Sequence, residues 1–307
     1  MDTATTVIAE LAALVNARMA AWTGGSLATL AGRKGLRDDP GEALTGHLER
    51  HREVISAWLK DSGEPHLLRW LRRRNQFVQL DAAAIAELDA LARQAREGAL
   101  AALGEGVGLR AAIAEVAATL RAGLAAFVRT QLGPEPREVR CSEYTPGLQL
   151  EVLGLGVAEL TAPVLDVGCG PAAALVQWLR SAGLTAEGID REAPASATLA
   201  DWLQFDYGVE RWGAVLSHLG FSLHLLHHHL AGRAAAFVHA EVYMQILRSL
   251  RVGGVFAYAP GLPFLERMLP RSHYACTRVE LAHPALRAAQ SDTGLSLGHA
   301  TQVRRLA

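Results

Sequence analysis

The residues best suited to chemistry surround a glycine-rich turn. The stretch VLDVGCGPAAAL runs from a hydrophobic strand through this turn into a helical pattern, and it contains Asp166, Gly168 and Gly170. Backbone N–H groups at such a strand-to-helix turn commonly hold a nucleotide. Asp190 ends the next strand-like run, at the distance along the chain where an acid binds ribose hydroxyls. The pattern therefore predicts a nucleotide-type ligand at Gly168, Gly170 and Asp190.

Asp166 helps to decide between two kinds of nucleotide. GCGPAA fits G-x-G-x-x-A, the pattern of dinucleotide sites, so an NAD enzyme is one candidate. However, Asp166 stands at the carboxyl end of the strand, where its carboxylate would repel a pyrophosphate in a partly desolvated crevice. S-adenosylmethionine has an ammonium, a sulfonium and no phosphate, so we predict it as the cofactor. Two plainer roles stay open: Asp166 as a cap of the next helix, and Asp190 as a solvated loop acid.

The motif VLDVGCGPA resembles the first motif, D/E-x-G-x-G-x-G, of class I S-adenosylmethionine-dependent methyltransferases, with Ala172 in place of the third glycine. The resemblance extends over Thr161 to Ala307 and includes GID, SLRVGGVFAYAP and an antiparallel final strand pair. It also includes ADWLQFD, which resembles the region that borders the adenine in that family. The resemblance implies that Asp201 bonds the adenine amino group and that Trp202 packs on the ring. The alternative is that Trp202 is a plain core residue.

Five histidines follow the fourth strand, WGAVLS, which ends at Ser217. Ligands of open α/β sheets bind beyond the carboxyl ends of the strands, so we predict Ser217 at the cofactor and the histidines near the methyl acceptor. His224 and His228 are four residues apart and share a helix face. An imidazole can take a proton from an acceptor hydroxyl, so His224, and after it His228, are the predicted catalytic residues. We predict no metal, although a metal pair completed by ligands from elsewhere and a helix with its polar tips in solvent remain alternatives.

Other polar clusters are weaker candidates. Tyr144, upstream of the first strand, is predicted to meet the cofactor or the acceptor, or else to tie down the linker. His47 and His51 lie one helical turn apart, without the Glu that directly follows the first His in zinc proteases, so a solvated face is favoured over a metal site. RWLRRR, from Arg69 to Arg74, is predicted to be a solvated face, or a face with salt bridges between the domains, rather than a nucleic-acid site.

Two kinds of scaffold position these residues. Residues 1–135 are rich in Ala, Leu and Arg with helical spacing, which predicts an all-α N-terminal domain that acts as a lid or in dimerisation. One of its helices is predicted to run from 41 to 60, and Asp81 to cap another. Gly133 to Pro136 is the predicted linker. Residues 136–307 alternate strands with helices, the last of them 235–252. This alternation predicts a Rossmann-like doubly wound α/β sheet, mostly parallel with an antiparallel edge strand.

Composition limits the classes of function. The formal net charge of −1 argues against a globally basic nucleic-acid binder. No run of 18 uncharged apolar residues is present, so no membrane span is expected, and three scattered cysteines suit a reducing cytoplasm. We predict a cytoplasmic methyltransferase of a small-molecule acceptor, with O-methylation favoured and a homodimer as one option. The alternatives are an RNA methyltransferase and a catalytically silent cofactor-binding protein that acts through partners.

Overall fold

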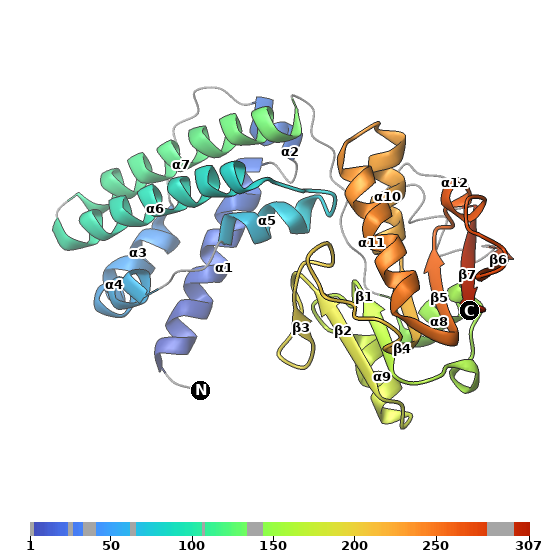
Figure 1. Ribbon diagram of the computed structural model, residues 1–307. Coiled ribbons are helices and arrows are strands. Elements are labelled where there is room, and N and C mark those ends of the chain that lie inside the picture. The colour runs from blue at the N-terminus through green and yellow to red at the C-terminus, as the bar shows by residue number, and fades with distance from the viewer. Residues whose placement is uncertain are drawn as a thin grey trace. The chain divides into compact units, whose positions relative to one another are not determined.

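The computed structural model describes residues 3–23, 27–32, 41–61, 66–105, 108–133, 144–280 and 298–307. The chain divides into two compact units, Met1–Cys141 and Ser142–Ala307, both drawn in Figure 1. Each unit has a hydrophobic core of its own. The predicted linker residues 134–136, and with them the boundary predicted after residue 135, lie outside the described residues.

Helices form the described part of the N-terminal unit, as predicted. They are α1 (Thr3–Thr23), α2 (Leu27–Gly32), α3 (Glu42–Arg50), α4 (Arg52–Asp61), α5 (His66–Arg74), α6 (Ala82–Glu105) and α7 (Leu109–Leu132). Oδ1 of Asp81 accepts a hydrogen bond from the N–H of Ala84 at 2.8 Å, so Asp81 caps α6 as expected. The helix predicted from 41 to 60 is instead two helices, because His51 leaves helical geometry between α3 and α4, with φ −119° and ψ 24°.

The two longest described helices, α6 and α7, lie side by side (Figure 1) and approach each other at glycines. A Cβ added to Gly98 would lie 2.8 Å from the side chain of Val116, and one added to Gly123 would lie 2.5 Å from that of Leu91. A larger residue at either position would require the side chain of Val116 or Leu91 to move. The two glycines therefore leave room for side chains of the neighbouring helix in the contact between α6 and α7.

By length and composition alone, two described helices could cross a membrane, Thr3–Ala21 and Leu109–Leu132. The second of them, α7, contributes Leu124, Phe127 and Val128 to the hydrophobic core of its unit. A core helix of a helical bundle meets the same criteria of length and hydropathy. The expected absence of a membrane span therefore stays a prediction.

A seven-stranded mixed sheet organises the C-terminal unit. Its strands are β1 (Val164–Val167), β2 (Ala186–Asp190), β3 (Thr198–Leu199), β4 (Trp212–His218), β5 (Leu250–Ala259), β6 (Tyr274–Glu280) and β7 (His299–Arg305), in the order β3-β2-β1-β4-β5-β7-β6. β1 to β5 pair in parallel, and β7 pairs antiparallel with both β5 and β6. The prediction of a mostly parallel Rossmann-like sheet that finishes with an antiparallel pair is confirmed.

Helices cover both faces of this sheet (Figure 1). They are α8 (Pro146–Leu153), the 3-10 helix η1 (Val157–Glu159), α9 (Ala174–Ser181), α10 (Phe221–Leu230), α11 (Ala235–Ser249) and α12 (Pro263–Glu266). α8 and α9 pack together on one face, and α10 and α11 pack together on the other. Every residue of β1 and β4 is buried, as expected for parallel strands covered on both sides.

The helix predicted over 235–252 is shorter than its sequence pattern indicated. α11 ends at Ser249 and β5 begins at Leu250, so the Gly-Gly pair that follows lies inside the strand. A Cβ on Gly254 would lie 3.0 Å from the carbonyl oxygen of Gly213 on β4. This close approach favours glycine, and it occurs where the register of the β4–β5 pair shifts.

Candidate functional site

The glycine turn is anchored between β1 and β2. The N–H groups of Gly168 and Cys169 both donate to the carbonyl of Ile189, at 2.9 and 3.2 Å. The N–H of Gly170 donates to Oδ2 of Asp190 at 3.1 Å. Because Asp190 is the last residue of β2, these bonds bring the predicted ribose-binding acid to the turn that follows β1.

The carboxylate of Asp190 is held by two hydrogen bonds and can accept more. Its Oδ1 accepts a bond from the N–H of Glu192 at 2.8 Å, and its Oδ2 accepts the bond from Gly170. A carboxylate oxygen has two lone pairs, so both oxygens can accept one further hydrogen bond, such as one from a ribose hydroxyl. Burial raises the pKa of Asp190, while the N–H groups of Glu192 and Gly170 act to lower it. Two backbone bonds set this residue apart from the freely solvated loop acid of the alternative.

Gly168 and Gly170 both have positive φ, 87° and 70°, a conformation that favours glycine. Their surroundings differ. A Cβ on Gly168 would lie 3.1 Å from Cζ3 of Trp202, whereas a Cβ on Gly170 would have nothing within 4 Å. Trp202 therefore covers the first glycine, and the second leaves open space at the backbone.

Asp166 is buried at the end of β1, with 2% of its surface exposed. Its Oδ2 has no hydrogen-bond partner among the described residues. The N-cap of α9 is Ala173 and no side chain caps that helix, so the alternative of a capping role is wrong. Burial, followed by the charge of Asp190, raises the pKa of Asp166 to about 7. A cationic group at Oδ2 would favour the ionised carboxylate and give this oxygen a partner.

Ser217 joins the end of β1 to the start of α10. Its buried hydroxyl donates to the carbonyl of Val167 at 2.9 Å and accepts from the N–H of Phe221, also at 2.9 Å. A Cβ on Gly220 would lie 3.0 Å from the same carbonyl oxygen. Ser217 therefore fixes where α10 begins. Its contact with a cofactor stays a prediction.

Tyr144 lies beside the end of β4. Its ring centroid is 4.9 Å from that of His218, in an edge-to-face arrangement, and its carbonyl accepts a hydrogen bond from Nε2 of Gln149 at 2.9 Å. Burial lowers the pKa of His218 to about 4, so this imidazole is neutral near pH 7. The structure thus brings Tyr144 to the strand end where the acceptor region was predicted to begin.

Trp202 connects the glycine turn to the histidines of α10. One edge of its ring lies against Gly168, and its ring centroid is 4.9 Å from that of His224, edge to face. Just before it, Oδ1 of Asp201 accepts a bond from the N–H of Leu203 at 3.0 Å. Trp202 is part of the hydrophobic core of the unit. The adenine contacts of Asp201 and Trp202 stay predictions.

Three buried histidines meet where α10 and α11 pack together, and we call them the histidine cluster. His224 and His228 come from α10 and His239 from α11, and each offers a ring nitrogen that lies within 4.8 Å of those of the other two. Both ring nitrogens of His228 and Nε2 of His239 are buried without a hydrogen-bond partner among the described residues. Sequence reasoning missed His239. Its only signal was a single histidine in a helix expected to cover the same sheet.

Burial keeps the imidazoles of α10 neutral. Burial, and to a lesser extent the charge of Arg191, lowers the pKa of His224 well below its usual value. Burial lowers the pKa of His228 to about 3. A general base works best when its pKa lies near the working pH. The base role of these two histidines stays a prediction. The alternative of polar tips in solvent does not apply to them, because both are buried, although it fits the exposed His229.

The arrangement of strands and site residues matches the resemblance seen in the sequence. A glycine turn follows β1, an acid ends β2, and the parallel strands are completed by the antiparallel β7. The C-terminal unit has the class I methyltransferase fold.

Comparisons with known proteins find similar solved structures. No protein-family model and no curated protein matches the chain. One similar structure is an rRNA methylase from Streptococcus thermophilus, with 15% identity, 54% of this chain and 100% of that chain covered, and a TM-score of 0.34. Another is a sugar N-methyltransferase from a Streptoalloteichus species, with 20% identity, coverages of 52% and 86%, and a TM-score of 0.28. A third is the cyclase SpnF, with 14% identity, coverages of 49% and 79%, and a TM-score of 0.31.

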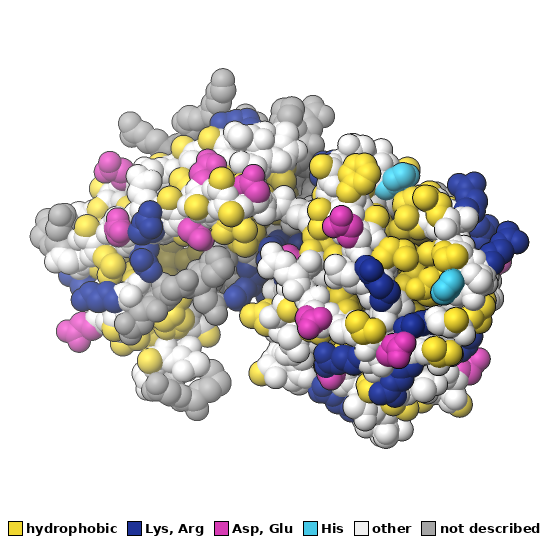
Figure 2. Space-filling view, viewed as in Figure 1, with side chains coloured by type: hydrophobic (Ala, Val, Ile, Leu, Met, Phe, Trp, Pro, Cys, Tyr) yellow, Lys and Arg dark blue, Asp and Glu magenta, His cyan; other side chains and the backbone are white. Residues whose placement is uncertain are grey.

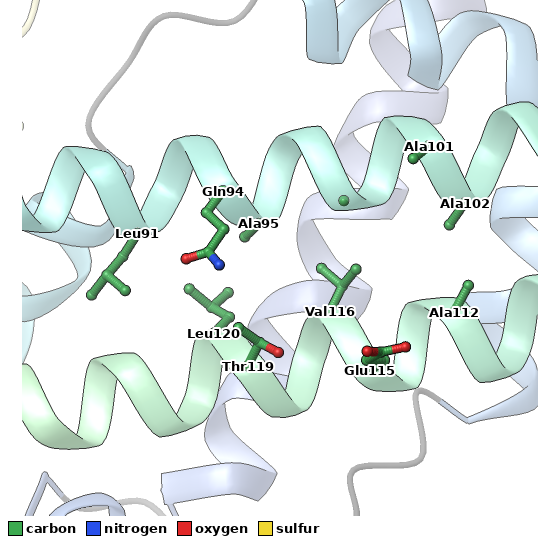
Figure 3. A pocket seen from close by; sticks show the side chains of 11 residues that line it. Leu91, Gln94, Ala95, Ala101, Ala102, Ala112, Glu115, Val116, Thr119 and Leu120 are labelled. Carbon is green, nitrogen blue, oxygen red and sulfur yellow. The ribbon is translucent and has the colours of Figure 1, made fainter.

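Among the described residues, the helical N-terminal unit has two cavities. One of about 290 Å³ lies between α6 and α7, and Gln94, Glu115 and Thr119 are its polar lining (Figure 3). The other, of about 940 Å³, is lined by apolar side chains of several helices and by arginines of the predicted Arg69 to Arg74 cluster. Part of that cluster therefore borders a hollow of its own unit.

The N-terminal unit contains a separate group of possible metal ligands, Glu10, His47 and His51. The prediction of a solvated face is wrong for His47, which is 3% exposed because α3 packs against α1. Its Nε2 is 3.1 Å from the carbonyl oxygen of Val7, and its Nδ1 is 3.6 Å from Oε2 of Glu10. Both ring nitrogens of His47 thus already have polar neighbours.

Proposed function

We propose that the C-terminal unit binds S-adenosylmethionine and transfers its methyl group to a small acceptor molecule. The observation that carries the proposal is the buried Oδ2 of Asp166, which has no hydrogen-bond partner among the described residues and lies at the strand end that precedes the glycine turn. A buried polar group left unpaired costs about 1–3 kcal/mol, and more when it is charged. The ammonium of the cofactor would relieve that cost. The pyrophosphate of NAD would increase it.

The residues around the turn fit this cofactor. Asp166 would hold its cationic amino-acid end, Gly170 leaves open space for it at the backbone, and Asp190 has lone pairs for the ribose hydroxyls. Asp201 and Trp202 would border the adenine. When bound, the cofactor supplies an electrophilic methyl group on its sulfonium. The contribution of this chain is to bind and orient the two reactants, which is where most of the rate of an in-line displacement arises.

The acceptor class that we propose is a small molecule methylated on oxygen. The neutral imidazole of His218 ends β4 beside Tyr144, and its Nε2 has no hydrogen-bond partner among the described residues, so it could accept a hydrogen bond from the hydroxyl of an acceptor. On the face drawn in Figure 2, basic and acidic side chains are intermixed over the lower part of the C-terminal unit, and basic side chains also gather at its right edge. The formal net charge of the chain is −1. The lack of excess positive charge favours a small acceptor over RNA, whose binding depends on neutralising many phosphates.

Isothermal titration with S-adenosylhomocysteine and with NAD tests the cofactor. We expect the full chain to bind S-adenosylhomocysteine and not NAD. Asp190→Ala should weaken binding by about 1.5–3 kcal/mol, the usual value of a hydrogen bond to a charged group. The matched control is Glu159→Ala, because this exposed acid also accepts a backbone bond, from the N–H of Gly156 at 2.6 Å. Its affinity should equal that of the wild type.

Two results would remove the proposal. One is tight NAD binding without any response to S-adenosylhomocysteine. The other is an unchanged affinity in a folded Asp190→Ala variant, since Asp190 would then lie outside the site. A steep dependence of acceptor affinity on salt concentration would replace the small acceptor by RNA and leave the cofactor assignment intact.

A further inference from the structure

The histidine cluster has a composition that neither a hydrophobic core nor a hydrogen-bond network explains. His228 is 1% exposed and His239 is fully buried. Three of the four ring nitrogens of these two residues have no hydrogen-bond partner among the described residues; the exception is Nδ1 of His239, which is 2.8 Å from the carbonyl oxygen of Ala235. Buried polar atoms normally have a partner. Unpaired imidazole nitrogens in a cluster whose ligand atoms lie within 4.8 Å of one another therefore indicate a shared ligand.

We propose that His224, His228 and His239 bind one divalent transition-metal ion of the Zn²⁺ class. Imidazole nitrogen is a preferred ligand of Zn²⁺, Cu²⁺ and Ni²⁺. A zinc ion held by three histidines takes solvent or another ligand in its fourth position. The proposal is independent of the cofactor, because none of the three histidines belongs to the glycine turn.

The geometry of the cluster suits such an ion after small side-chain movements. The three ligand nitrogens lie within 4.8 Å of one another. With Zn–N bonds of about 2.0–2.1 Å, tetrahedral coordination brings ligand nitrogens to about 3.4 Å apart. His224 and His228 share one face of α10 and His239 comes from the neighbouring α11, so rotations of these side chains can close the remaining distance without separating the helices.

Nδ1 of His239 already has the kind of partner that orients a metal ligand. Metal-bound histidines usually donate their second ring N–H to a carbonyl or a carboxylate, which fixes the other nitrogen toward the ion. If Nδ1 of His239 carries the proton, it donates to the carbonyl of Ala235 and Nε2 is left as the free ligand atom. That is the nitrogen that lacks a partner.

Charges around the cluster are mixed. The carboxylate of Asp201 acts on His239, whereas Arg191 acts on His224 and Arg233 on His228. A bound cation would be attracted by Asp201 and repelled by the two arginines. Asp201 is therefore the charge near the cluster that would favour a bound cation.

An occupied metal site would also change the predicted roles of the α10 histidines. A nitrogen bound to a metal cannot receive a proton, so His224 and His228 would be ligands and not general bases. Trp202, whose ring contacts that of His224, would then lie between this metal ligand and Gly168 of the glycine turn.

Equilibrium dialysis of the full chain against Zn²⁺ tests the proposal, with protein that carries no histidine tag and has been stripped with a chelator. The measurement is made in a His51→Ala background, which removes the other candidate group, Glu10, His47 and His51. We expect one tightly bound ion per chain. His228→Ala and His239→Ala should each weaken binding more than about 100-fold, the upper range for loss of a residue that only hydrogen-bonds to a metal ligand.

The matched control is His229→Ala on the same helix. The ring of His229 is exposed and stacks on Phe264, away from the cluster, so this variant should bind the ion as the parent does. Because the cluster variants alter a buried site, the parent protein is also loaded with Co²⁺. Intense visible absorption bands of four-coordinate, nitrogen-ligated Co²⁺ are expected.

Three results would overturn the proposal. These are less than one ion per chain in the parent protein, the weak spectrum of six-coordinate Co²⁺, and unchanged affinity in a folded His228→Ala protein.

Discussion

The glycine turn and the histidine cluster are two buried polar regions of the same unit, and they satisfy their hydrogen bonds differently. At the turn, backbone N–H groups are paired with Ile189 and Asp190, so the polar groups hold the shape of the chain. In the cluster, the nitrogens of His228 find no partner among the described residues. The turn also has one unpaired atom, Oδ2 of Asp166. In both regions the unpaired polar atoms are the candidates for contact with a ligand.

The largest expected effect concerns Asp166 and pH. Its pKa is raised from 3.8 to about 7 in the folded chain, so between these values the folded state binds the proton that the unfolded state releases. Stability should therefore fall as the pH rises from about 4 to 7, by roughly 4 kcal/mol at 1.36 kcal/mol per pH unit. Urea unfolding of the wild type and of Asp166→Asn across this range measures it. The variant should lose this slope, and equal slopes in the two proteins would show that Asp166 is not buried as described.

The second effect tests the paired side of the comparison. Ser217→Ala removes the hydroxyl that bonds both Val167 and Phe221, and it leaves a buried carbonyl and a buried N–H unpaired. We expect a loss of about 1–3 kcal/mol in the free energy of unfolding. Ser181→Ala is the control, since its exposed hydroxyl donates to the carbonyl of Trp178 at the surface and should matter by about 0.5 kcal/mol or less. Equal losses in the two variants would show that Ser217 does not fix the start of α10.

The smallest effect separates the two glycines of the turn. Gly168→Ala and Gly170→Ala both place a side chain at positive φ, at a cost of about 1–2 kcal/mol each. Only the first also presses on Trp202, so it should be less stable than the second by about another 1 kcal/mol. Thermal unfolding of the pair gives the difference. A Gly170→Ala protein less stable than Gly168→Ala would contradict the open space described at Gly170.

The sequence predicted the turn better than the cluster for a physical reason. Asp166, Gly168, Gly170 and Asp190 lie within one strand-turn-helix-strand unit, whose local order fixes their proximity. The cluster depends on how α10 packs against α11. The spacing of His224 and His228 predicted their shared face, but nothing in the sequence of α11 identified which of its residues would turn toward them.

Two boundaries in the fold illustrate the same limit. The helical pattern up to 252 continued past Ser249, where the chain instead enters β5 because that strand pairs with β4. The break at His51 between α3 and α4 also had no Gly or Pro to indicate it. At Ser249, pairing of β5 with β4 outweighed the helical preference that the local sequence indicates.

We propose that the carboxylate of Asp166 binds the ammonium of S-adenosylmethionine. Titration calorimetry at pH 6 with S-adenosylhomocysteine, in two buffers of different ionisation enthalpy, tests it most directly. Asp166 is mostly protonated at that pH, since its pKa is about 7, and an ammonium would drive the proton off. We expect close to one proton released per ligand in the wild type, none in Asp166→Asn, and weaker binding in the variant. Equal proton release and equal affinity in the two proteins would contradict the claim.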